Sequence, residues 1–371
     1  MILCPLQTPN SSRSSAWSTI RSTITMITSA KIASRPSRQR VPLLDIPGYY
    51  PMDTVLRKGR PFYYQLNPPR VKMQDIGENP IEHAARKYQA YPGSQYALPT
   101  DDLEQERLIL QHQTLKKLFG NRILLAPVKL EKNDKVLDIG TGPGLWIMDL
   151  AASVDPSVSI VGVDIESRLF LTSPPKNIEL RLESVVNLPS EWTDTFALVH
   201  QRLLMIALQI SQWPVALREI YRVLRPGGWV QLGESTAWIE GQYPNKPCME
   251  KLVAMYRCLT NSRNLYIDCA DAIPSMLEAA GFVDIQRESQ MPQMGKWAGE
   301  LGVASRINHV GVLRGIKTPI LKAGGYGHVT SEKEYDALLE GLEREWDETP
   351  TEQNPGTQKE FVIVWARKPD V

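Results

Sequence analysis

Short apolar segments that alternate with helical segments constrain the fold of this chain more than any other feature. Strand–helix–strand units of this kind form sheets of parallel strands with helices on both faces. The alternation begins after residue 134 and predicts an α/β fold with a doubly wound, mostly parallel, seven-stranded sheet. The seven expected strands lie at residues 135–140, 158–165, 177–184, 195–202, 229–235, 282–289 and 360–369.

Composition divides the rest of the chain into further parts. Residues 1–44 contain six Lys or Arg, many Ser and Thr, and no Asp or Glu. This composition is typical of a mitochondrial-type transit peptide, and the alternatives are a disordered tail or residues upstream of a true start at Met26. We expect an N-terminal extension with a lid helix at 45–125. The main domain would then span 126–371, with a helical cap inserted at about 246–323.

The overall composition fits an ordinary globular protein. The net charge is +1, and 42% of the residues are hydrophobic, so neither a nucleic-acid partner nor a membrane partner is expected. No run approaches the ~18 apolar residues that a membrane-spanning helix needs. We expect a cytoplasmic protein, and the basic tail leaves the nucleus or the mitochondrion as alternatives. Neither disulfides nor a metal site is expected, because no C-x-x-C pair joins Cys4, Cys248, Cys258 and Cys269.

A glycine-rich turn follows the first expected strand. In the stretch VLDIGTGPGLW, Gly140, Gly142 and Gly144 form the pattern G-x-G-x-G. Leu145 occupies the place of the third glycine of a dinucleotide-binding turn. Such a turn brings backbone amides at a helix start close to a nucleotide. Asp138 would repel a pyrophosphate but suits an ammonium group, so the electrostatics favour S-adenosylmethionine over NAD or FAD.

A second carboxylate supports a nucleoside ligand. Asp164 closes the second expected strand, 24 residues after Gly140. A carboxylate at this place can accept hydrogen bonds from both hydroxyls of a ribose. Together with the glycine turn, it indicates a site for an S-adenosylmethionine-type cofactor.

Four stretches of the sequence resemble a known family. YALPTDDLEQERLILQH, DIGTGPGLWIMDLA, ALREIYRVLRPGGWVQLGES and MGKWAGELGV are similar to class I S-adenosylmethionine-dependent methyltransferases, and among these to the fungal LaeA-like group. The resemblance runs from about Tyr96 to Val371 and implies a Rossmann-like fold. Members of this group mostly methylate secondary metabolites or regulate their production.

The resemblance also implies roles for individual residues. The methionine half of the cofactor would contact Asp138, Gly140, Thr141, Gly142 and Gly144, and the ribose would contact Asp164. The family often has an Asp after the third strand, near the adenine amino group. This chain has Ser184 there, with Glu183 beside it, so Ser184 is assigned to the adenine, and Glu183 or a backbone group is the alternative.

Two side chains at the ends of expected strands are candidates for the chemistry. His200 ends the fourth expected strand and is the candidate general base, since the ordinary pKa of histidine lies near neutrality. The alternative is a structural or solvent-facing histidine. Glu234 ends the fifth strand and is expected to orient the cofactor or a loop. In the cap, His309 is a second histidine that could enter the site or lie on a helix surface, and Trp297 is expected to contact an apolar or aromatic acceptor.

The sequence therefore predicts an enzyme that transfers a methyl group to an O, N or S atom of a small-molecule secondary metabolite. A cap rich in Met, Leu and Ala suits an apolar or aromatic acceptor better than a nucleic acid. Two alternatives stay open. One is a LaeA-like nuclear regulator with regulatory protein partners, and the other is a methyltransferase fold that catalyses a non-methylating rearrangement.

Overall fold

The computed structural model describes residues 86–371. The predictions for residues 1–44, and for the part of the extension before residue 86, lie outside the described residues. No helix within 86–371 is long and apolar enough to cross a membrane.

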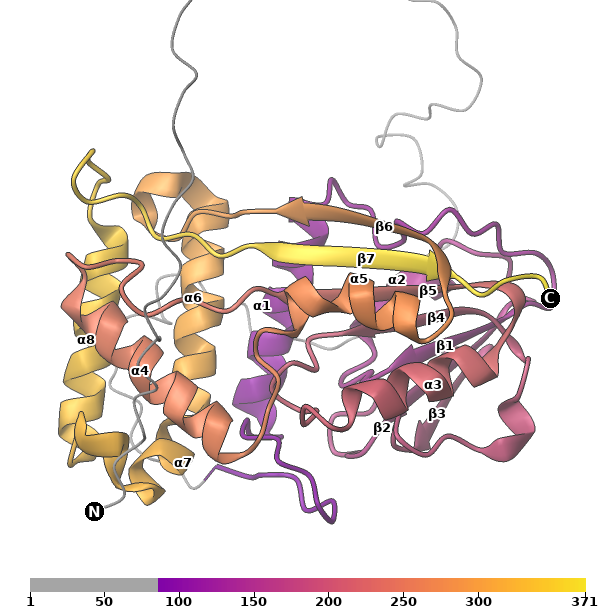
Figure 1. Ribbon diagram of the computed structural model, residues 1–371, viewed down its shortest axis with the longest axis horizontal. Coiled ribbons are helices and arrows are strands. Elements are labelled where there is room, and N and C mark those ends of the chain that lie inside the picture. The colour runs from indigo at the N-terminus through magenta and orange to yellow at the C-terminus, as the bar shows by residue number, and fades with distance from the viewer. Residues whose placement is uncertain (1–85) are drawn as a thin grey trace, which may run out of the picture. The chain divides into compact units, whose positions relative to one another are not determined.

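A seven-stranded sheet forms the centre of this part of the chain (Figure 1). Its strand order is β3-β2-β1-β4-β5-β7-β6. The first five strands pair in parallel, whereas β7 runs antiparallel to both of its neighbours. The predicted α/β fold is thus confirmed. The strands are β1 (Lys135–Ile139), β2 (Ser159–Asp164), β3 (Ile178–Leu182), β4 (Phe196–Arg202), β5 (Leu224–Ser235), β6 (Val283–Gln290) and β7 (Phe361–Arg367).

Eight α-helices accompany the sheet in the described part. Helices α3 and α5 pack on β5, whereas α2 packs on β2. The spacing of apolar residues explains the position of α3, because Trp213, Leu217 and Ile220 lie on one helical face and are fully buried. The helices are α1 (Asp102–Leu118), α2 (Leu145–Ala151), α3 (Trp213–Val223), α4 (Pro247–Ser262), α5 (Cys269–Ala279), α6 (Gly299–Gly315), α7 (Lys317–Lys322) and α8 (Glu332–Asp347).

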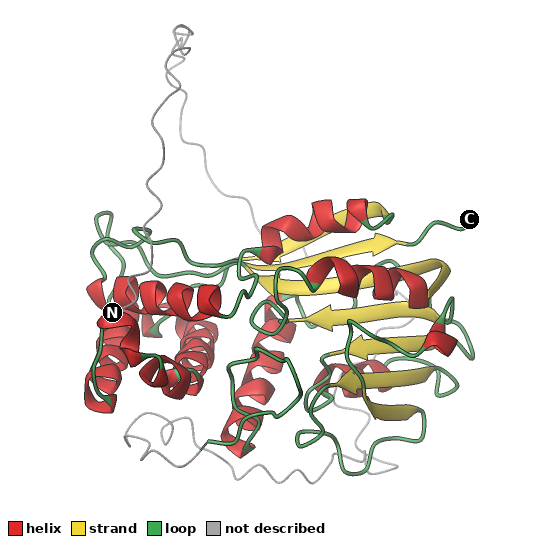
Figure 2. Cartoon of the chain, turned by 60° about the horizontal axis from the view of Figure 1, so that its bottom comes forward, coloured by secondary structure: helices red, strands yellow, loops and turns green. Residues whose placement is uncertain are grey.

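The helical cap consists of α4, α6, α7 and α8, which pack on one another beside the sheet (Figures 1 and 2). The expected insertion at 246–323 is therefore interrupted, because within it β6 is a strand of the sheet and α5 packs on the sheet. Helix α8 joins the cap from beyond residue 323. Helix α1 packs on α6 and lies between the cap and the strands (Figure 1).

Candidate active site

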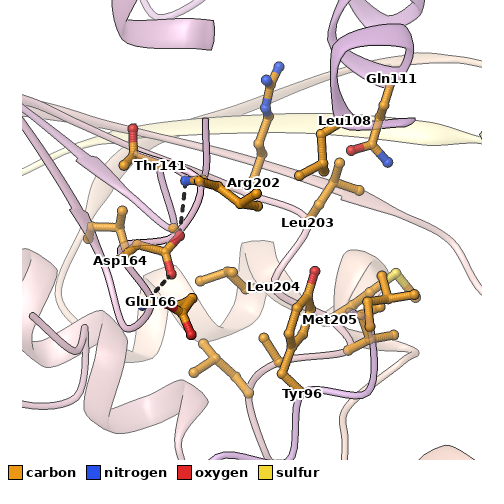
Figure 3. Close-up of a pocket in the computed structure, with 18 of the residues that line it drawn as sticks. Tyr96, Leu108, Gln111, Thr141, Asp164, Glu166, Arg202, Leu203, Leu204 and Met205 are labelled. Carbon is orange, nitrogen blue, oxygen red and sulfur yellow. Dashed lines mark hydrogen bonds between the residues drawn. The ribbon is translucent and has the colours of Figure 1, made fainter. Parts of the chain in front are cut away.

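A cavity of about 470 Å³ lies where the parallel strands end. The loops after β1, β2, β3 and β4 line it, together with α1, α6 and the segment before β7. Open α/β sheets bind their ligands at this edge, and the volume suits a drug-sized molecule. Figure 3 shows part of the cavity, with side chains from α1 and from the strand ends directed into it.

The glycine turn forms one wall of the cavity. Gly140 and Gly142 have φ angles of 66° and 51°, which side chains other than glycine rarely adopt. A Cβ atom on Gly140 would also lie 2.9 Å from Cδ2 of Leu204. Gly140, Thr141 and Gly142 line the cavity, whereas Gly144 does not and instead starts α2 in a left-handed conformation.

Asp164 links this turn to the end of β2. Its Oδ2 atom accepts a hydrogen bond from the Gly142 amide at 2.9 Å, and its Oδ1 atom accepts one from the Glu166 amide at 3.2 Å (Figure 3). Burial raises the pKa of Asp164 to about 6, although these backbone amides oppose the shift. The carboxylate lines the cavity with further lone pairs available, so it can accept hydroxyl donors such as those of a ribose.

Asp138 lies at the cavity wall, but its two oxygens already have partners within the protein. The Thr141 hydroxyl donates to Oδ2 at 2.7 Å, and Nδ1 of His200 lies 2.7 Å from Oδ1. The Asp138 side chain is buried. Its negative charge is thus held rigidly beneath the glycine turn, where it favours a cationic ligand group.

The position of His200 contradicts the prediction that it accepts a proton from the acceptor. His200 is buried and does not line the cavity. Its ring stacks on Trp146, with ring centres 3.8 Å apart. Burial lowers the pKa of His200, although Asp138 opposes the shift. The histidine therefore orients Asp138, and it does so because strand β4 continues past it to Arg202.

Ser184 lines the cavity beside the end of β3. Its carbonyl accepts a hydrogen bond from the Asn187 amide at 2.9 Å, which closes a tight turn. Glu183 also lines the cavity and forms an ion pair with Arg181 at 3.2 Å. Val185 and Val186 add apolar surface to the same wall, so this region offers one hydroxyl and one carboxylate beside apolar groups.

Glu234 shapes the loop after β4. Its carboxylate accepts hydrogen bonds from the amides of Leu204 at 2.7 Å and Met205 at 3.3 Å. Leu203 adopts a positive φ of 59°, an uncommon conformation that these hydrogen bonds stabilise. Burial raises the pKa of Glu234 to about 8. The Glu234 side chain thus orients the loop that carries Leu203, Leu204 and Met205.

A buried ion pair joins α1 to the cap. Arg107 donates to both carboxylate oxygens of Glu104, at 2.5 and 3.0 Å, and to Oδ1 of Asn308 at 2.8 Å. All three side chains are buried. We call these residues the α1–α6 latch, since Asn308 belongs to α6. No sequence motif pointed to them, because Arg107 and Asn308 are 201 residues apart.

Two residues of the cap differ in how they relate to the cavity. His309 lines it, and the pKa of this histidine is lowered to about 3, mainly by burial. Its Nδ1 atom donates to the Ser305 carbonyl at 2.8 Å, which leaves a neutral ring with Nε2 unprotonated. Trp297 does not line the cavity, and its indole N–H donates to the Trp346 carbonyl at 3.0 Å. The expectation that Trp297 contacts the acceptor is therefore wrong.

Comparison with known proteins relates this geometry to a class of enzyme. A methyltransferase-domain model matches residues 136–228, which include the glycine turn and β1 to β4. The chain is 29% identical to the N-methyltransferase sirN of Leptosphaeria maculans, over 75% of this chain and 96% of that protein. It is 27% identical to the N-methyltransferase verN of Clonostachys rogersoniana, over 79% of this chain and 99% of that protein. It is also 26% identical to the secondary metabolism regulator LAE1 of Pyricularia oryzae, over 60% of this chain and 69% of that protein.

Proposed function

We propose that this chain, as a class I S-adenosylmethionine-dependent methyltransferase, methylates a nitrogen atom of a small secondary metabolite. Two relatives that match almost over their full length are named N-methyltransferases. The observation that carries the proposal is the cavity at the strand ends, which holds the glycine turn and Asp164 at one wall and the cap at another. S-adenosylmethionine supplies a methyl group on a positively charged sulfur.

The residues at the first wall fit this methyl donor. In the proposal, Gly140, Thr141 and Gly142 contact its methionine half, and Gly144 keeps the turn in shape. Asp138 provides the negative charge for the ammonium group. The carboxylate of Asp164 receives the ribose hydroxyls, because two of its lone pairs are already fixed by backbone amides and the rest face the cavity.

Ser184 and the valines beside it would surround the adenine. Apolar surface beside a hydroxyl and the Glu183 carboxylate suits a flat aromatic base that carries an amino group. The acceptor would occupy the part of the cavity beneath α6, where His309 and Val312 line the wall. A cavity of about 470 Å³ favours a small molecule as the acceptor.

Incubation with isotopically labelled methyl donor tests the proposal. Extract from a strain that lacks this gene is mixed with the protein and S-adenosylmethionine that carries a trideuterated methyl group. We expect one extract component to gain a single trideuterated methyl group on nitrogen, as read by mass spectrometry and NMR. Cofactor binding without any labelled product would overturn the proposal.

Metabolite profiles of the same strain separate the alternatives. A dedicated enzyme leaves one accumulated intermediate that lacks a methyl group. Simultaneous loss of many unrelated metabolites would instead support a regulator like LAE1. Conversion of an extract component without label would support a non-methylating rearrangement.

A further inference from the structure

The segments before and after β7 carry two buried lysines with different surroundings. Lys368 is 8% exposed, and its Nζ atom donates to Oδ1 of Asp194 at 2.6 Å. Lys359 is 9% exposed and lines the cavity, yet within residues 86–371 its Nζ atom has no carboxylate or carbonyl partner. A buried polar group without a partner is costly, so its retention calls for a physical reason. The other buried lysines of the described part, Lys246, Lys317 and Lys368, each donate to an oxygen.

The Lys359 amino group lies over an aromatic ring that is itself held in place. Its Nζ atom is 3.8 Å from the ring centre of Trp238. The Trp238 indole N–H donates to the Gln358 carbonyl at 3.0 Å, and Arg257 donates to the Trp238 carbonyl at 3.0 and 2.6 Å. These contacts fix the amino group at the cavity wall without supplying a counter-charge.

The surroundings of Lys359 favour its neutral form more than water does. Burial, and to a smaller extent the positive charge of Arg257, lower the pKa of Lys359 to about 7. The other titratable groups around it are Tyr256 on α4 and His309 on α6, which line the same small hollow. A proton acceptor works best when its pKa lies near the working pH. The pKa of His309, at about 3, is too low for an effective base.

The sheet places Lys359 at the same edge as the glycine turn. Strand β7 runs antiparallel to β5, and Phe361 at its start pairs with Ser235 at the end of β5. Lys359 precedes this pair by two residues, so it lies beside the carboxyl ends of the parallel strands. Lys359, Gly140 and Asp164 therefore line one cavity, although they come from opposite halves of the sheet.

We propose that Lys359 is a catalytic residue that accepts the proton released by the acceptor atom during methyl transfer. This inference rests on the function proposed above. The lone pair of the acceptor nitrogen forms the new bond to the methyl carbon, and the carbon–sulfur bond breaks with its electron pair left on sulfur. The proton of the nitrogen passes to the neutral Nζ amine. The positive charge of the sulfonium thus reappears as the Lys359 ammonium over the Trp238 ring, and no net charge is created in the cavity.

Two substitutions of Lys359 separate its possible roles. K359M keeps a long apolar side chain over Trp238 but removes the amine. K359R keeps a cation that does not release its proton near neutral pH. K368M is the matched control, since Lys368 is a buried lysine that also lies over an aromatic ring, at 4.8 Å from the Tyr221 centre, but does not line the cavity.

The measurements are S-adenosylhomocysteine affinity by calorimetry and the rate of S-adenosylhomocysteine formation in the presence of the deletion-strain extract. We expect both Lys359 variants to bind within about threefold of wild type but to turn over about 100-fold more slowly or worse. K368M should lose thermal stability and keep its turnover. The ¹³Cε signal of Lys359, assigned by its absence in K359M, should titrate near neutral pH in the wild-type protein.

Each contrary result has its own meaning. Wild-type turnover by K359R would show that Lys359 binds an anionic group of the acceptor, and wild-type turnover by K359M would show that it has no chemical role. A Lys359 signal that titrates above about pH 10, the ordinary range of lysine, would also overturn the proposal. Wild-type protein that binds S-adenosylhomocysteine but never transfers a methyl group would overturn the proposed function itself, and this inference with it.

Discussion

Replacement of Asp164 by Asn tests the cofactor site most directly. The Asp164 carboxylate accepts the Gly142 and Glu166 amides, at 2.9 and 3.2 Å, and its other lone pairs face the cavity. In D164N one oxygen becomes an NH₂ group, which cannot accept. Whichever way the amide turns, at least one former donor loses its acceptor.

The expected loss follows from the charge of this acceptor. A hydrogen bond to a charged group contributes about 1.5–3 kcal/mol, so loss of one ribose hydrogen bond should weaken binding about 10- to 150-fold. Calorimetry with S-adenosylhomocysteine at pH 8 measures this change. D149N is the matched control, because Asp149 on α2 binds His112 and Lys116 and does not line the cavity.

The same carboxylate should make cofactor affinity depend on pH. The pKa of Asp164 is about 6 in the free protein, and ribose hydroxyls favour its ionised form. At pH 5 roughly one tenth of the protein would be ionised at this residue, so the apparent Kd should rise about tenfold from its value at pH 8. D164N should lack this dependence. A D164N affinity within twofold of wild type, or a wild-type affinity that is equal at both pH values, would refute the reasoning.

Three further substitutions or conditions test the surrounding structure. R107M leaves the Glu104 carboxylate buried without its partner. The free energy of unfolding measured in urea should therefore fall by about 3–5 kcal/mol, and hydrogen exchange in α1 should accelerate. A fall of under about 1 kcal/mol would argue against the α1–α6 latch. G142V places a β-branched residue at a φ of 51°, and we expect folded protein without calorimetric cofactor binding, so unchanged affinity would contradict the proposed site. Burial lowers the pKa of His112 and His200, so the folded state binds fewer protons than the unfolded state once the pH falls below about 6.5. Each histidine should then remove up to about 1.4 kcal/mol of stability per pH unit, and an H112Q protein whose stability changes between pH 7.5 and pH 5 by the same amount as that of wild type would exclude this effect for His112.

The glycine turn and the strand pattern could be predicted because they depend on neighbours a few residues away. Apolar periodicity marked all seven strands, and the turn needs Gly140 and Gly142 for its positive φ angles. The position of Asp164 could be predicted for a similar reason, since the last residue of a parallel strand lies at the edge of the sheet where ligands bind.

The prediction for His200 failed because the neighbours of a strand side chain depend on which strands pair and in which register. His200 pairs in register with Asp138 on β1, so the two side chains lie side by side on one face and form a hydrogen bond. His200 lies near the carboxyl end of its strand both in the sequence and in β4, and this position alone suggested a side chain at the cavity. The sequence did not show that the ring would turn to Asp138 and Trp146 in the interior.

The sequence by itself determined the fold class, the glycine turn and the place of Asp164 at the end of β2, because short-range periodicity and turn geometry encode them. The tertiary structure alone decided which side chains of the cap and of the segment before β7 line the cavity. Lys359, from the segment before β7, and His309 of α6 both contact the ring of Trp238 and line one small hollow. The low pKa values of these two residues arise from burial by that packing, and burial is not encoded in any local motif.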